Sequence, residues 1–546
     1  MPLMGSLYVG ASGLQTSQNA LNTTAHNLSN IDTTGYTRQQ VLQGTRRYNV
    51  LSYNKNSIAN QEVGLGVNFS KVRQVRDTFI DQTYRKESGR SMFYEVSSGA
   101  LSEVESLLGE FQGEAFQDSI ERFWTAIQEL AKDPGSSVTQ GVFVQRASTF
   151  IERAGSVYEQ LEKYQDNLNT QTKNMVDKIN DYGNKIVALN EQIRFIECGG
   201  VESPNDLKDV RNQLIDELSK MTDISYSQEL DGSISIQIEG VDFVKMDRCY
   251  EIGLKVDATT GFYTPFWPQN ATYRILEDGT KEYNIDGAEV FNLDREISSD
   301  LDTDIGGLKA TLLARGDHRA DYTDLAEDRY DKTVSQSVVM NIQAEFDQLI
   351  HNVVTKVNEI LEKSGYMKNS DGSPMQLFEK VTTPGYDYDT ATGSWVYRAE
   401  DPNVPDSLYT VKNLRINKEL LQSPSKLGFR KEDKTVDQET ADALKNSFTE
   451  EIYTLNPNVK KKTTFVDYYT DMVAQVANSG SVYQSIAKNQ EATVNNTVSA
   501  REQVVGVSSE EELSNMIKFQ NAYNASSRYI NVISEMLEHI LSTLGR

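Results

Sequence analysis

Apolar residues recur every seven positions at the start of the chain, and this pattern predicts a helix. The repeat consists of Leu7, Leu14, Leu21 and Leu28, with Ala11 and Ala25 between them. Such a repeat is typical of a helix that packs along a second helix. We expect the helix to end near Asn30, which tolerates a left-handed cap. Gly35 should then form a turn before "YTRQQVL" leaves as an extended segment.

Two further stretches have the same spacing. One predicts a helix of roughly 60 Å, at about 1.5 Å per residue, that breaks at "CGGVESPND". Its apolar positions are Leu161, Leu168, Met175, Tyr182, Leu189 and Ile196, flanked by Ile179, Ile186 and Ile193. The other stretch closes the chain and is interrupted chiefly by Ser526. Its apolar positions are Met516, Phe519, Tyr523, Ile530, Ile533, Leu537, Ile540 and Leu544.

The apolar period changes from seven to two in the middle of the chain. Ile234, Ile236 and Ile238 alternate with polar residues behind the turn Asp231-Gly232, which predicts β hairpins over 223–306. Residues 366–436 are rich in Gly, Pro, Asp and Tyr, so they suit a second insertion that is β-rich or loop-rich. A helical pattern covers 76–132, where "KDPG" ends it, and returns on both sides of the second insertion.

These patterns divide the chain into seven predicted segments. They are a helix with an extended segment (1–75), the first part of a helical domain (76–222), a β-rich domain (223–306), a helical return (307–365), a β- or loop-rich insertion (366–436), the second part of the helical domain (437–505) and a final helix (506–546). The fold class is therefore multidomain and mainly α. We expect terminal coiled-coil helices and a long helical bundle, with β-rich domains inserted in the middle.

Each terminal helix has one apolar stripe and needs a partner to bury it. We expect the two ends to meet, although the pattern alone fits packing within one chain as well as packing between chains. An ordinary helical hairpin inside a monomer has the same repeat. The near-continuous apolar stripe of the C-terminal helix favours contacts with other helices on more than one side. We also expect both end segments to be mobile in an isolated subunit.

Composition excludes several classes of function. The 546 residues carry a formal net charge of −25, which argues against nucleic-acid binding. The start "MPLMGSLYVGASG" does not resemble a signal peptide, and no apolar run reaches the roughly 18 residues of a membrane span. Cys198 and Cys249 are too far apart in sequence, and too few, to indicate a disulfide framework or a zinc site.

Searches for catalytic and metal-binding patterns find none that is complete. The four histidines, at positions 26, 318, 351 and 539, are dispersed, and neither an HExxH pattern nor a Gly-Lys pair of a phosphate loop occurs. In "DLDTDIGG", Asp300, Asp302 and Asp304 have the spacing of a calcium loop. However, Ile305 and Thr311 occupy the positions that require glycine and glutamate. We therefore expect neither metal nor cofactor, and no enzyme activity.

The segment "AHNLSNIDTTGY", residues 25–36, resembles the pattern A-N-N-x-A-N-x-x-T-x-G-Y of the axial proteins of the bacterial flagellum. His26 replaces the first asparagine of the pattern and Ser29 its second alanine. The next residues, "TRQ", are similar to the hook-associated protein 1 family within that group. Further segments resemble the same family in the same order, among them "FWTAIQELAKDPGSSVTQGVFVQRA", "GGLKATLLARGD" and "EEELSNMIKFQNAYNASSRYINVISEMLEHIL".

The resemblance implies an exported structural subunit that joins the flagellar hook to the filament. Its implied partners are other copies of itself in a ring, the hook protein, a second hook-filament junction protein and an export chaperone. Export would use the flagellar type III apparatus without a cleaved signal peptide and would place the protein outside the cell. A rod or hook axial protein, and an enzyme with a catalytic insertion at 366–436, are the alternatives.

The same resemblance assigns assembly residues at both ends of the chain. At the N-terminus they are Leu7, Leu14, Leu21, Leu28, Asn27, Asn30, Gly35 and Tyr36. At the C-terminus they are Met516, Phe519, Tyr523, Ile530, Ile533, Leu537, Ile540 and Leu544, which would also bind the chaperone.

Overall fold

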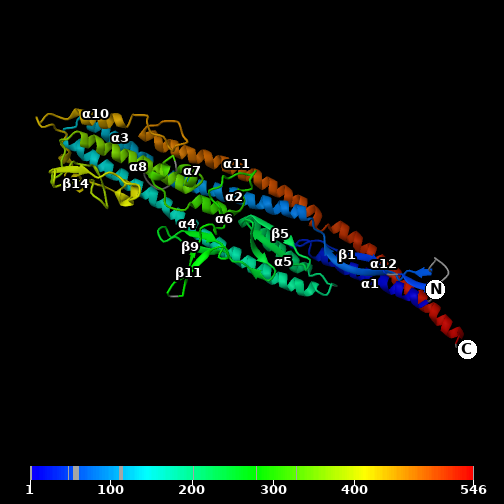
Figure 1. Ribbon diagram of the computed structural model, residues 1–546. Coiled ribbons are helices and arrows are strands. Elements are labelled where there is room, and N and C mark those ends of the chain that lie inside the picture. The colour runs from blue at the N-terminus through cyan, green and yellow to red at the C-terminus, as the bar shows by residue number, and fades with distance from the viewer. Residues whose placement is uncertain are drawn as a thin grey trace.

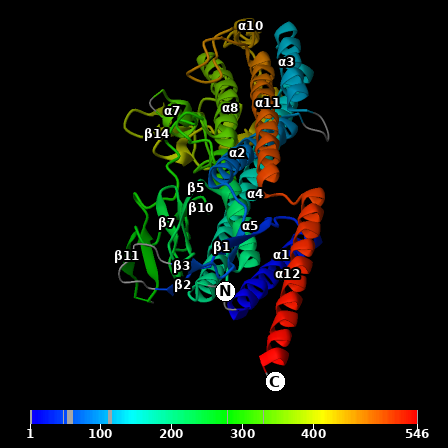
Figure 2. The ribbon, with the colours of Figure 1, turned by 90° about the vertical axis from the view of Figure 1, so that its right-hand side faces the viewer.

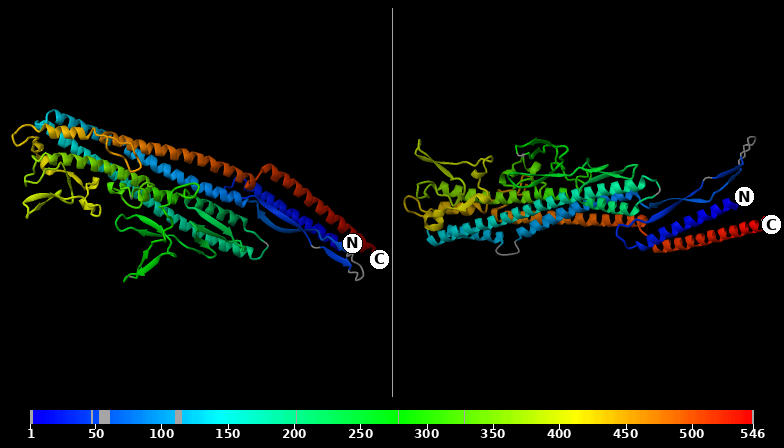
Figure 3. Two further views of the ribbon diagram at one scale, coloured as in Figure 1. Left: turned by 45° about the horizontal axis from the view of Figure 1, so that its top comes forward. Right: turned by 90° about the horizontal axis from the view of Figure 1, so that it is seen from below.

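The computed structural model describes residues 3–46, 48–52, 61–109, 115–200, 202–277, 279–327 and 329–544. The molecule is elongated, with a long helical bundle that carries β-rich insertions along one side (Figures 1 and 3). The first and last helices extend from one end of the bundle, so both termini lie at that end (Figure 1). The fold is multidomain and mainly α, as the sequence predicts.

The helices of the bundle bury a large apolar core and smaller apolar clusters beside it. The helices are α2 (Thr78–Leu108), α3 (Phe116–Lys132), α4 (Ser137–Glu197), α5 (Asn205–Met221), α6 (Gly307–Arg315), α8 (Val338–Lys363), α10 (Gln438–Ser447) and α11 (Phe465–Val505), with the short α7 (Tyr330–Thr333). At about 1.5 Å per residue, the 61 residues of α4 extend roughly 90 Å. Stacked and edge-on aromatic rings fill the core around Phe116, Phe123 and Phe150.

Three helical predictions differ from the structure. The helix predicted over 76–132 is divided, because α2 ends at Leu108 with Gly109 as its C-cap, while α3 begins at Phe116. Helix α4 begins at Ser137, where the Ser136 hydroxyl accepts a hydrogen bond from the Val138 amide, well before the predicted heptads. The helical pattern predicted over 437–505 is broken at 448–464, where "NPN" replaces helix-forming residues.

The β-rich domain packs against α4 and α5. Strands β5 (Ile224–Gln228), β6 (Ile234–Ile238), β7 (Val241–Lys245) and β8 (Arg248–Cys249) form one antiparallel sheet, followed by hairpins β9 (Gly253–Val256) with β10 (Tyr263–Phe266) and β11 (Thr272–Ile275) with β12 (Lys281–Asn284). Ile234, Ile236 and Ile238 point into the core, which confirms the predicted alternation. Gly183 lets α4 approach closely, since a Cβ there would lie 2.5 Å from the Cys249 sulfur.

The second insertion is mostly loop with two short ribbons. They are β13 (Phe378–Lys380) with β16 (Leu414–Ile416), and β14 (Tyr386–Asp389) with β15 (Ser394–Tyr397). Short helical turns η2 (Pro405–Ser407), η3 (Val411–Asn413), α9 (Lys418–Gln422) and η4 (Pro424–Leu427) complete it, while η1 (Tyr322–Leu325) precedes α7. This insertion covers the end of the bundle that is far from the termini (Figure 1).

The terminal unit consists of two antiparallel helices and a β ribbon. Helix α1 (Leu3–Ser29) lies beside α12 (Ser509–Leu544), and both separate from the bundle at the end of α11 (Figure 2). Strands β1 (Gln39–Thr45) and β4 (Val67–Gln74) pair along α1, and β2 (Asn49–Ser52) pairs with β3 (Gln61–Val63). The two ends of the chain therefore meet within one subunit.

Candidate assembly interface at the chain ends

The predicted leucine stripe of α1 is only half-buried in the single chain. Leu7, Leu14, Leu21 and Leu28 all keep part of their surface exposed. The fully buried side of the helix is instead small and polar, and consists of Ser6, Gly10, Ser12, Thr16, Ser17, Ala20, Thr24 and Asn27. Small side chains allow the backbone of α1 to approach both α12 and the ribbon β1–β4 closely.

Two glycines mark the closest approach between α1 and α12. A Cβ on Gly10 would lie 2.7 Å from Ile530 Cγ1, and one on Gly13 would lie 2.8 Å from Ser526 Oγ. Ser526 interrupts the apolar stripe of the final helix, and it lies where the second helix comes nearest. The interruption is thus a contact between small residues.

The predicted residues of α12 differ in how far α1 covers them. Ile533 is buried, with 6% of its surface exposed, and Ile540 is 37% exposed. Between these limits lie the half-buried Met516, Phe519, Tyr523, Ile530 and Leu537. Leu544 ends the helix, and its side chain is outside the part of the chain that the structure describes. The predicted residues therefore lie along the contact with α1 over most of the length of α12.

A second apolar face of α12 has no cover from α1. Its members, each between 45% and 60% exposed, are Leu513, Ile517, Val532 and Met536. We call these four residues the outer face of α12. The heptad pattern did not predict this face. Leu513 and Ile517 are four residues apart, as are Val532 and Met536, and this helical spacing is present in the sequence.

Asn27 holds the chain where it leaves α1. Its carboxamide oxygen accepts hydrogen bonds from the Tyr36 hydroxyl at 2.8 Å and the Gln39 amide at 3.0 Å, and its nitrogen donates to the Gln39 carbonyl at 2.9 Å. The asparagine is 1% exposed. Burial and nearby carboxylates raise the pKa of Tyr36, so its hydroxyl stays protonated and donates. The predicted pair Asn27 and Tyr36 is therefore brought together.

Asn30 and Gly35 shape the turn after the helix, but the predicted left-handed cap at Asn30 is wrong, because Asn30 has no positive φ and Gly35 is the residue that does. The Asn30 amide and side-chain nitrogen both donate to the His26 carbonyl, and its carboxamide oxygen accepts from the Thr33 hydroxyl. Gly35 has φ of +78°, and a Cβ there would collide with Gln213 of α5. The Gln213 side chain donates to the Thr34 carbonyl at 2.6 Å. The backbone conformation therefore favours glycine here, and a larger residue would also displace the Gln213 side chain.

The next two residues attach this turn to the bundle and to α12. Thr37, which is fully buried, donates from its amide and its hydroxyl to the two carboxylate oxygens of Asp209 on α5. Burial raises the pKa of Asp209 to about 6, although its hydrogen bonds with Thr37 oppose the rise. Arg38 pairs with Glu511 at 2.8 Å and with the buried Glu512 at 2.9 Å.

Nothing in the sequence pattern predicted these carboxylates as partners of the "TR" pair. The Thr37–Asp209 contact spans 172 positions and the Arg38–Glu512 contact spans 474. No local periodicity reports contacts of that range. The segment "TTGYTRQ" thus connects three elements that are distant in sequence, namely α1, α5 and α12.

A cluster of charges lies where α11 meets α2 and α5. Arg501 near the end of α11 pairs with Asp81 and Asp216, at 2.8 Å in each case, and its guanidinium lies 4.7 Å from the ring of Tyr84. Arg76 also pairs with Asp81, and Arg85 with Asp216. These contacts hold the last turn of the bundle before the chain bends at Gly506 into α12.

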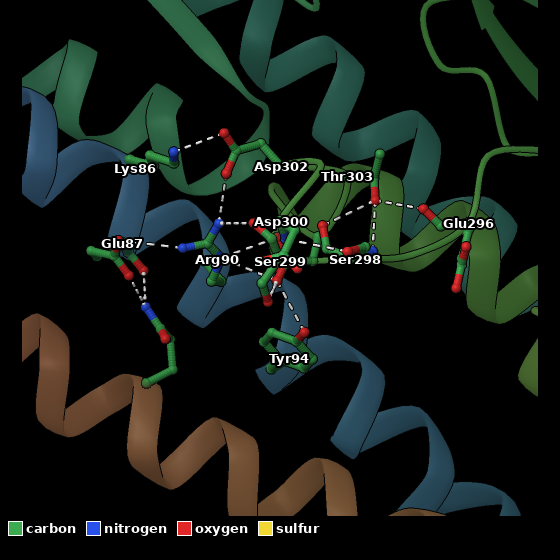
Figure 4. Close-up of polar contacts among 12 residues, drawn as sticks. Lys86, Glu87, Arg90, Tyr94, Glu296, Ser298, Ser299, Asp300, Asp302 and Thr303 are labelled. Carbon is green, nitrogen blue, oxygen red and sulfur yellow. Dashed lines mark hydrogen bonds and ion pairs between the residues drawn. The ribbon is translucent and has the colours of Figure 1, made fainter.

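The acidic loop before α6 serves to attach the β-rich domain to α2. Arg90 pairs with Asp304 at 3.0 Å. Arg90 also pairs with Asp302, at 2.8 Å, as does Lys86 (Figure 4). Tyr94 donates to Asp304, which is fully buried. Cations from α2 thus pair with Asp302 and Asp304, two of the three carboxylates that gave the loop its calcium-like spacing. Within the described ranges, no group of three or more His, Cys, Asp or Glu is placed to hold a metal ion.

The remaining candidate groups have structural contacts. His318 lies between Asp317 and Asp324, and these hydrogen bonds raise the pKa of its imidazole to about 10. His351 stacks on a tyrosine and contacts Glu400 at 2.9 Å. Cys198 and Cys249 are both free thiols. No helix in the described part of the chain is long and apolar enough to cross a membrane.

Comparisons with known proteins place both ends and the bundle in flagellar families. The chain matches the flagellar hook-associated protein FlgK helical domain over residues 101–376. It also matches the flagella basal body rod protein family over 7–37 and the C-terminal family of the flagellar basal body rod FlgEFG proteins over 502–543. The two shorter matches coincide with α1 plus its exit turn and with α12.

Curated relatives match over nearly their whole length. Flagellar hook-associated protein 1 of Bacillus subtilis (strain 168) is 26% identical over 538 residues, covering 97% of this chain and 96% of the relative. The protein of the same name from Escherichia coli (strain K12) is 23% identical over 563 residues, covering 99% of this chain and all of the relative.

A solved structure has the same fold. It is described as the flagellar hook junction protein FlgK from Burkholderia pseudomallei, and it aligns with a TM-score of 0.52 at 13% identity, covering 78% of this chain and all of that chain. Because the FlgK helical domain match spans half of the sequence, the chain belongs to the FlgK family of flagellar hook-associated proteins.

Proposed function

We propose that the chain is a structural subunit of the bacterial flagellum that forms the junction between hook and filament. In this proposal, copies polymerise on the hook through α1 and α12 and allow the filament to grow. The observation that carries the proposal is the outer face of α12, which stays exposed although α1 already covers the opposite side of the helix. A helix with apolar residues on two faces needs a second partner to bury them.

Neighbouring copies are the partner that this face fits best. A tube of helices surrounds each α12 with more than one other helix, so both of its apolar faces can be buried there. The proposed site residues are the heptad positions of α1 and α12, with Asn27, Asn30, Gly35 and Tyr36 setting the angle at which the pair leaves the bundle. Further proposed partners are the hook protein, a second hook-filament junction protein and an export chaperone on the C-terminal helix.

The proposed location is outside the cell, at the hook-filament junction, after export without a cleaved signal peptide. A rod or hook axial protein is the alternative of the same structural class. The FlgK helical domain match favours the junction, because it covers residues 101–376 of the bundle and its insertions, whereas the rod families match only the two ends. An enzyme is the less favoured class, and turnover of glycan or peptide by the purified protein would support it.

The decisive experiment changes the outer face without touching the α1 contact. Val532 and Met536 are 45% and 49% exposed and lie one turn apart on α12. Val532→Asp combined with Met536→Asp would place two carboxylates where a neighbouring helix packs, at a cost of several kcal/mol per buried charge. The isolated variant should melt like the parent, yet cells that make it should release flagellin instead of growing filaments.

Asn531→Asp with Ser534→Asp is the matched control, because both residues are polar and exposed on the same helix. This variant adds the same charge and should leave filaments intact. Export of each variant into the medium must be measured first, since a chaperone would contact the same helix. Normal filaments from a well-exported Val532 and Met536 double variant would contradict assembly through this face.

The heptad stripe needs a separate test. Leu537→Asp with Ile540→Asp changes the residues that border α1, so it should also lower protection of α12 from hydrogen exchange. Electron microscopy of a strain that lacks the gene would then show hooks without filaments if the junction is the right location. Loss of the hook itself would favour the rod or hook alternative.

A further inference from the structure

A large cavity in the described chain lies between the terminal unit and the β-rich domain. It has a volume of about 910 Å³ and is enclosed by β4, the start of α2, the end of α4, α5 and the β5–β6 hairpin. It lies away from the outer face of α12, and neither the proposed assembly contacts nor the loop that holds Arg90 uses it. The cavity therefore needs an explanation of its own.

Arg211 of α5 is a buried cation in the wall of this cavity. The residue is 2% exposed, and its Nη1 donates to the Asn190 side chain at 2.8 Å and to the Gly232 carbonyl at 2.9 Å. Its Nε has no hydrogen-bond partner. Within the described residues, Arg211 forms no ion pair. Burial lowers the pKa of its guanidinium to about 10, so it is still a cation at neutral pH.

The neighbouring charges already have partners and leave Arg211 without one. Arg76 pairs with Asp81, and Arg85 with Asp216. Glu197, the carboxylate with the largest effect on Arg211, is held by Lys208 at 2.5 Å and by the Ser203 hydroxyl at 2.9 Å. A buried charge with no counterion is rare in folded proteins, because desolvation makes it costly.

The rest of the cavity wall contains further donors for an anion. Lys71, Arg73 and Arg194 line it with exposed side chains, outside the ion pairs found among the described residues. Helix α5 begins at Asn205 without a side-chain cap, and Ser203 and Asn205 also line the cavity. The uncapped start of a helix presents free amide groups to an anion.

The cavity wall also contains carboxylates, but most of them already have hydrogen-bond or ion-pair partners. Glu229 and Asp231 accept hydrogen bonds from the serine hydroxyls of their own hairpin, at Ser235 and Ser233. Glu202 is exposed. None of them neutralises Arg211.

We propose that this cavity binds an oxyanion, whose oxygens accept hydrogen bonds from the free part of the Arg211 guanidinium and from the cations at the rim. The oxyanion can be free in solution, such as phosphate, or it can be a carboxylate on a side chain of another copy. Both offer the same charged oxygens. Because β4, α5 and the β5–β6 hairpin all line the site, its occupant would fasten the terminal unit to the β-rich domain.

Titration calorimetry of the full chain with inorganic phosphate tests the proposal at constant ionic strength, with chloride as the competing anion. We expect saturable binding, and affinity at least tenfold weaker in Arg211→Gln. Arg194→Gln, at the exposed rim, should weaken binding less and leaves the buried contacts of α5 intact, so it serves if Arg211→Gln unfolds. Arg248→Gln on β8 is the control, because that exposed arginine lies outside the cavity and should leave the affinity unchanged.

Sedimentation separates the two sources of the anion. If a carboxylate of another copy is the occupant, the parent chain should associate in phosphate-free buffer, phosphate should dissociate it, and Arg211→Gln should remain monomeric. If a free anion is the occupant, the parent should bind phosphate as a monomer. Phosphate binding that is equal in the parent, Arg211→Gln and Arg194→Gln would overturn the proposal. So would the absence of both phosphate binding and Arg211-dependent association.

Discussion

Gly10 of α1 and Ile530 of α12 approach so closely that any side chain on the glycine would displace the isoleucine. A Cβ on Gly10 would lie 2.7 Å from Ile530 Cγ1 and 3.1 Å from the Tyr529 ring. Glycine weakens an isolated helix by roughly 0.5–1 kcal/mol relative to alanine. Gly10 therefore makes α1 alone less stable but allows the two end helices to pack closely.

Gly10→Ala should loosen this pair. Gly155→Ala in α4 is the matched control, because an added Cβ there meets nothing within 4 Å. We expect Gly155→Ala to raise the free energy of unfolding by about 0.5–1 kcal/mol, while Gly10→Ala fails to do so. Hydrogen exchange of α12 should become faster only in Gly10→Ala. Equal stabilisation by both substitutions would mean that the helices do not touch at Gly10 in solution.

Asn27→Ala should release the segment that follows α1. The substitution removes three hydrogen bonds and leaves the Gln39 amide, the Gln39 carbonyl and the Tyr36 hydroxyl without this partner. Unsatisfied buried polar groups cost about 1–3 kcal/mol each. We expect amide exchange along 36–39 to accelerate strongly. Asn22→Ala, at an exposed position of the same helix, should change stability by less than about 0.5 kcal/mol.

The sequence was sufficient to predict the elements whose periodicity is local. The end of α1 near Asn30, the heptad helix inside α4, the alternation at Ile234, Ile236 and Ile238, and the final helix are all present. Each of these patterns reports which side of an element is apolar. It does not report what covers that side.

The unpredicted features depend on contacts between distant parts of the chain. Gly10, Gly13 and Ser526 look like weak positions in a heptad repeat, yet they form the close contact between the end helices. The partners of Thr37 and Arg38 follow from how α5 and α12 are placed. For the same reason, the sequence could not distinguish packing within one chain from packing between chains, nor could it reveal that Arg211 lines a cavity.

Arg38 and Glu512 should be energetically coupled. Glu512 is 2% exposed, and the two side chains meet at 2.9 Å where α12 begins. A double-mutant cycle with Arg38→Met and Glu512→Gln should give a coupling energy of about 0.5–3 kcal/mol, because close charged groups are not independent. Proteolysis near 506–509 reports the opening of this joint. A coupling energy of zero would show that Arg38 interacts with Glu512 too weakly to hold α12.

Arg90→Met should strongly destabilise the attachment of the β-rich domain. It leaves Asp304, which is fully buried, without its cation, and breaking a buried pair costs about 3–5 kcal/mol. Lys86→Met is the control, because its pair with Asp302 is largely exposed and is worth less than about 1 kcal/mol. Millimolar calcium should leave the melting temperature of the parent unchanged, since Lys86 and Arg90 already pair with Asp302 and Asp304. A rise of several degrees would contradict that assignment.

Buried carboxyl groups on α8 should make the bundle more stable in mild acid than in mild alkali. Burial raises the pKa of Glu345 from 4.5 to about 7 and that of Asp347 from 3.8 to about 8. Each proton is bound more tightly in the folded chain than in the unfolded chain. The stability that these groups contribute is therefore fully present below their unfolded pKa values and is lost as the pH rises through about 7 to 8.

Urea unfolding at pH 6 and pH 8.5 tests this sign. We expect the free energy of unfolding to fall by on the order of 2 kcal/mol over this interval in the parent, and by less in Glu345→Gln, which cannot ionise. His318 shifts stability in the same direction, because its pKa is raised to about 10. Its effect is equal in parent and variant and cancels in their difference. Glu159→Gln, whose carboxylate is exposed and has a lowered pKa, should behave like the parent at both pH values. If Glu345→Gln retains the full pH dependence, ionisation of Glu345 is not what destabilises the bundle in alkali.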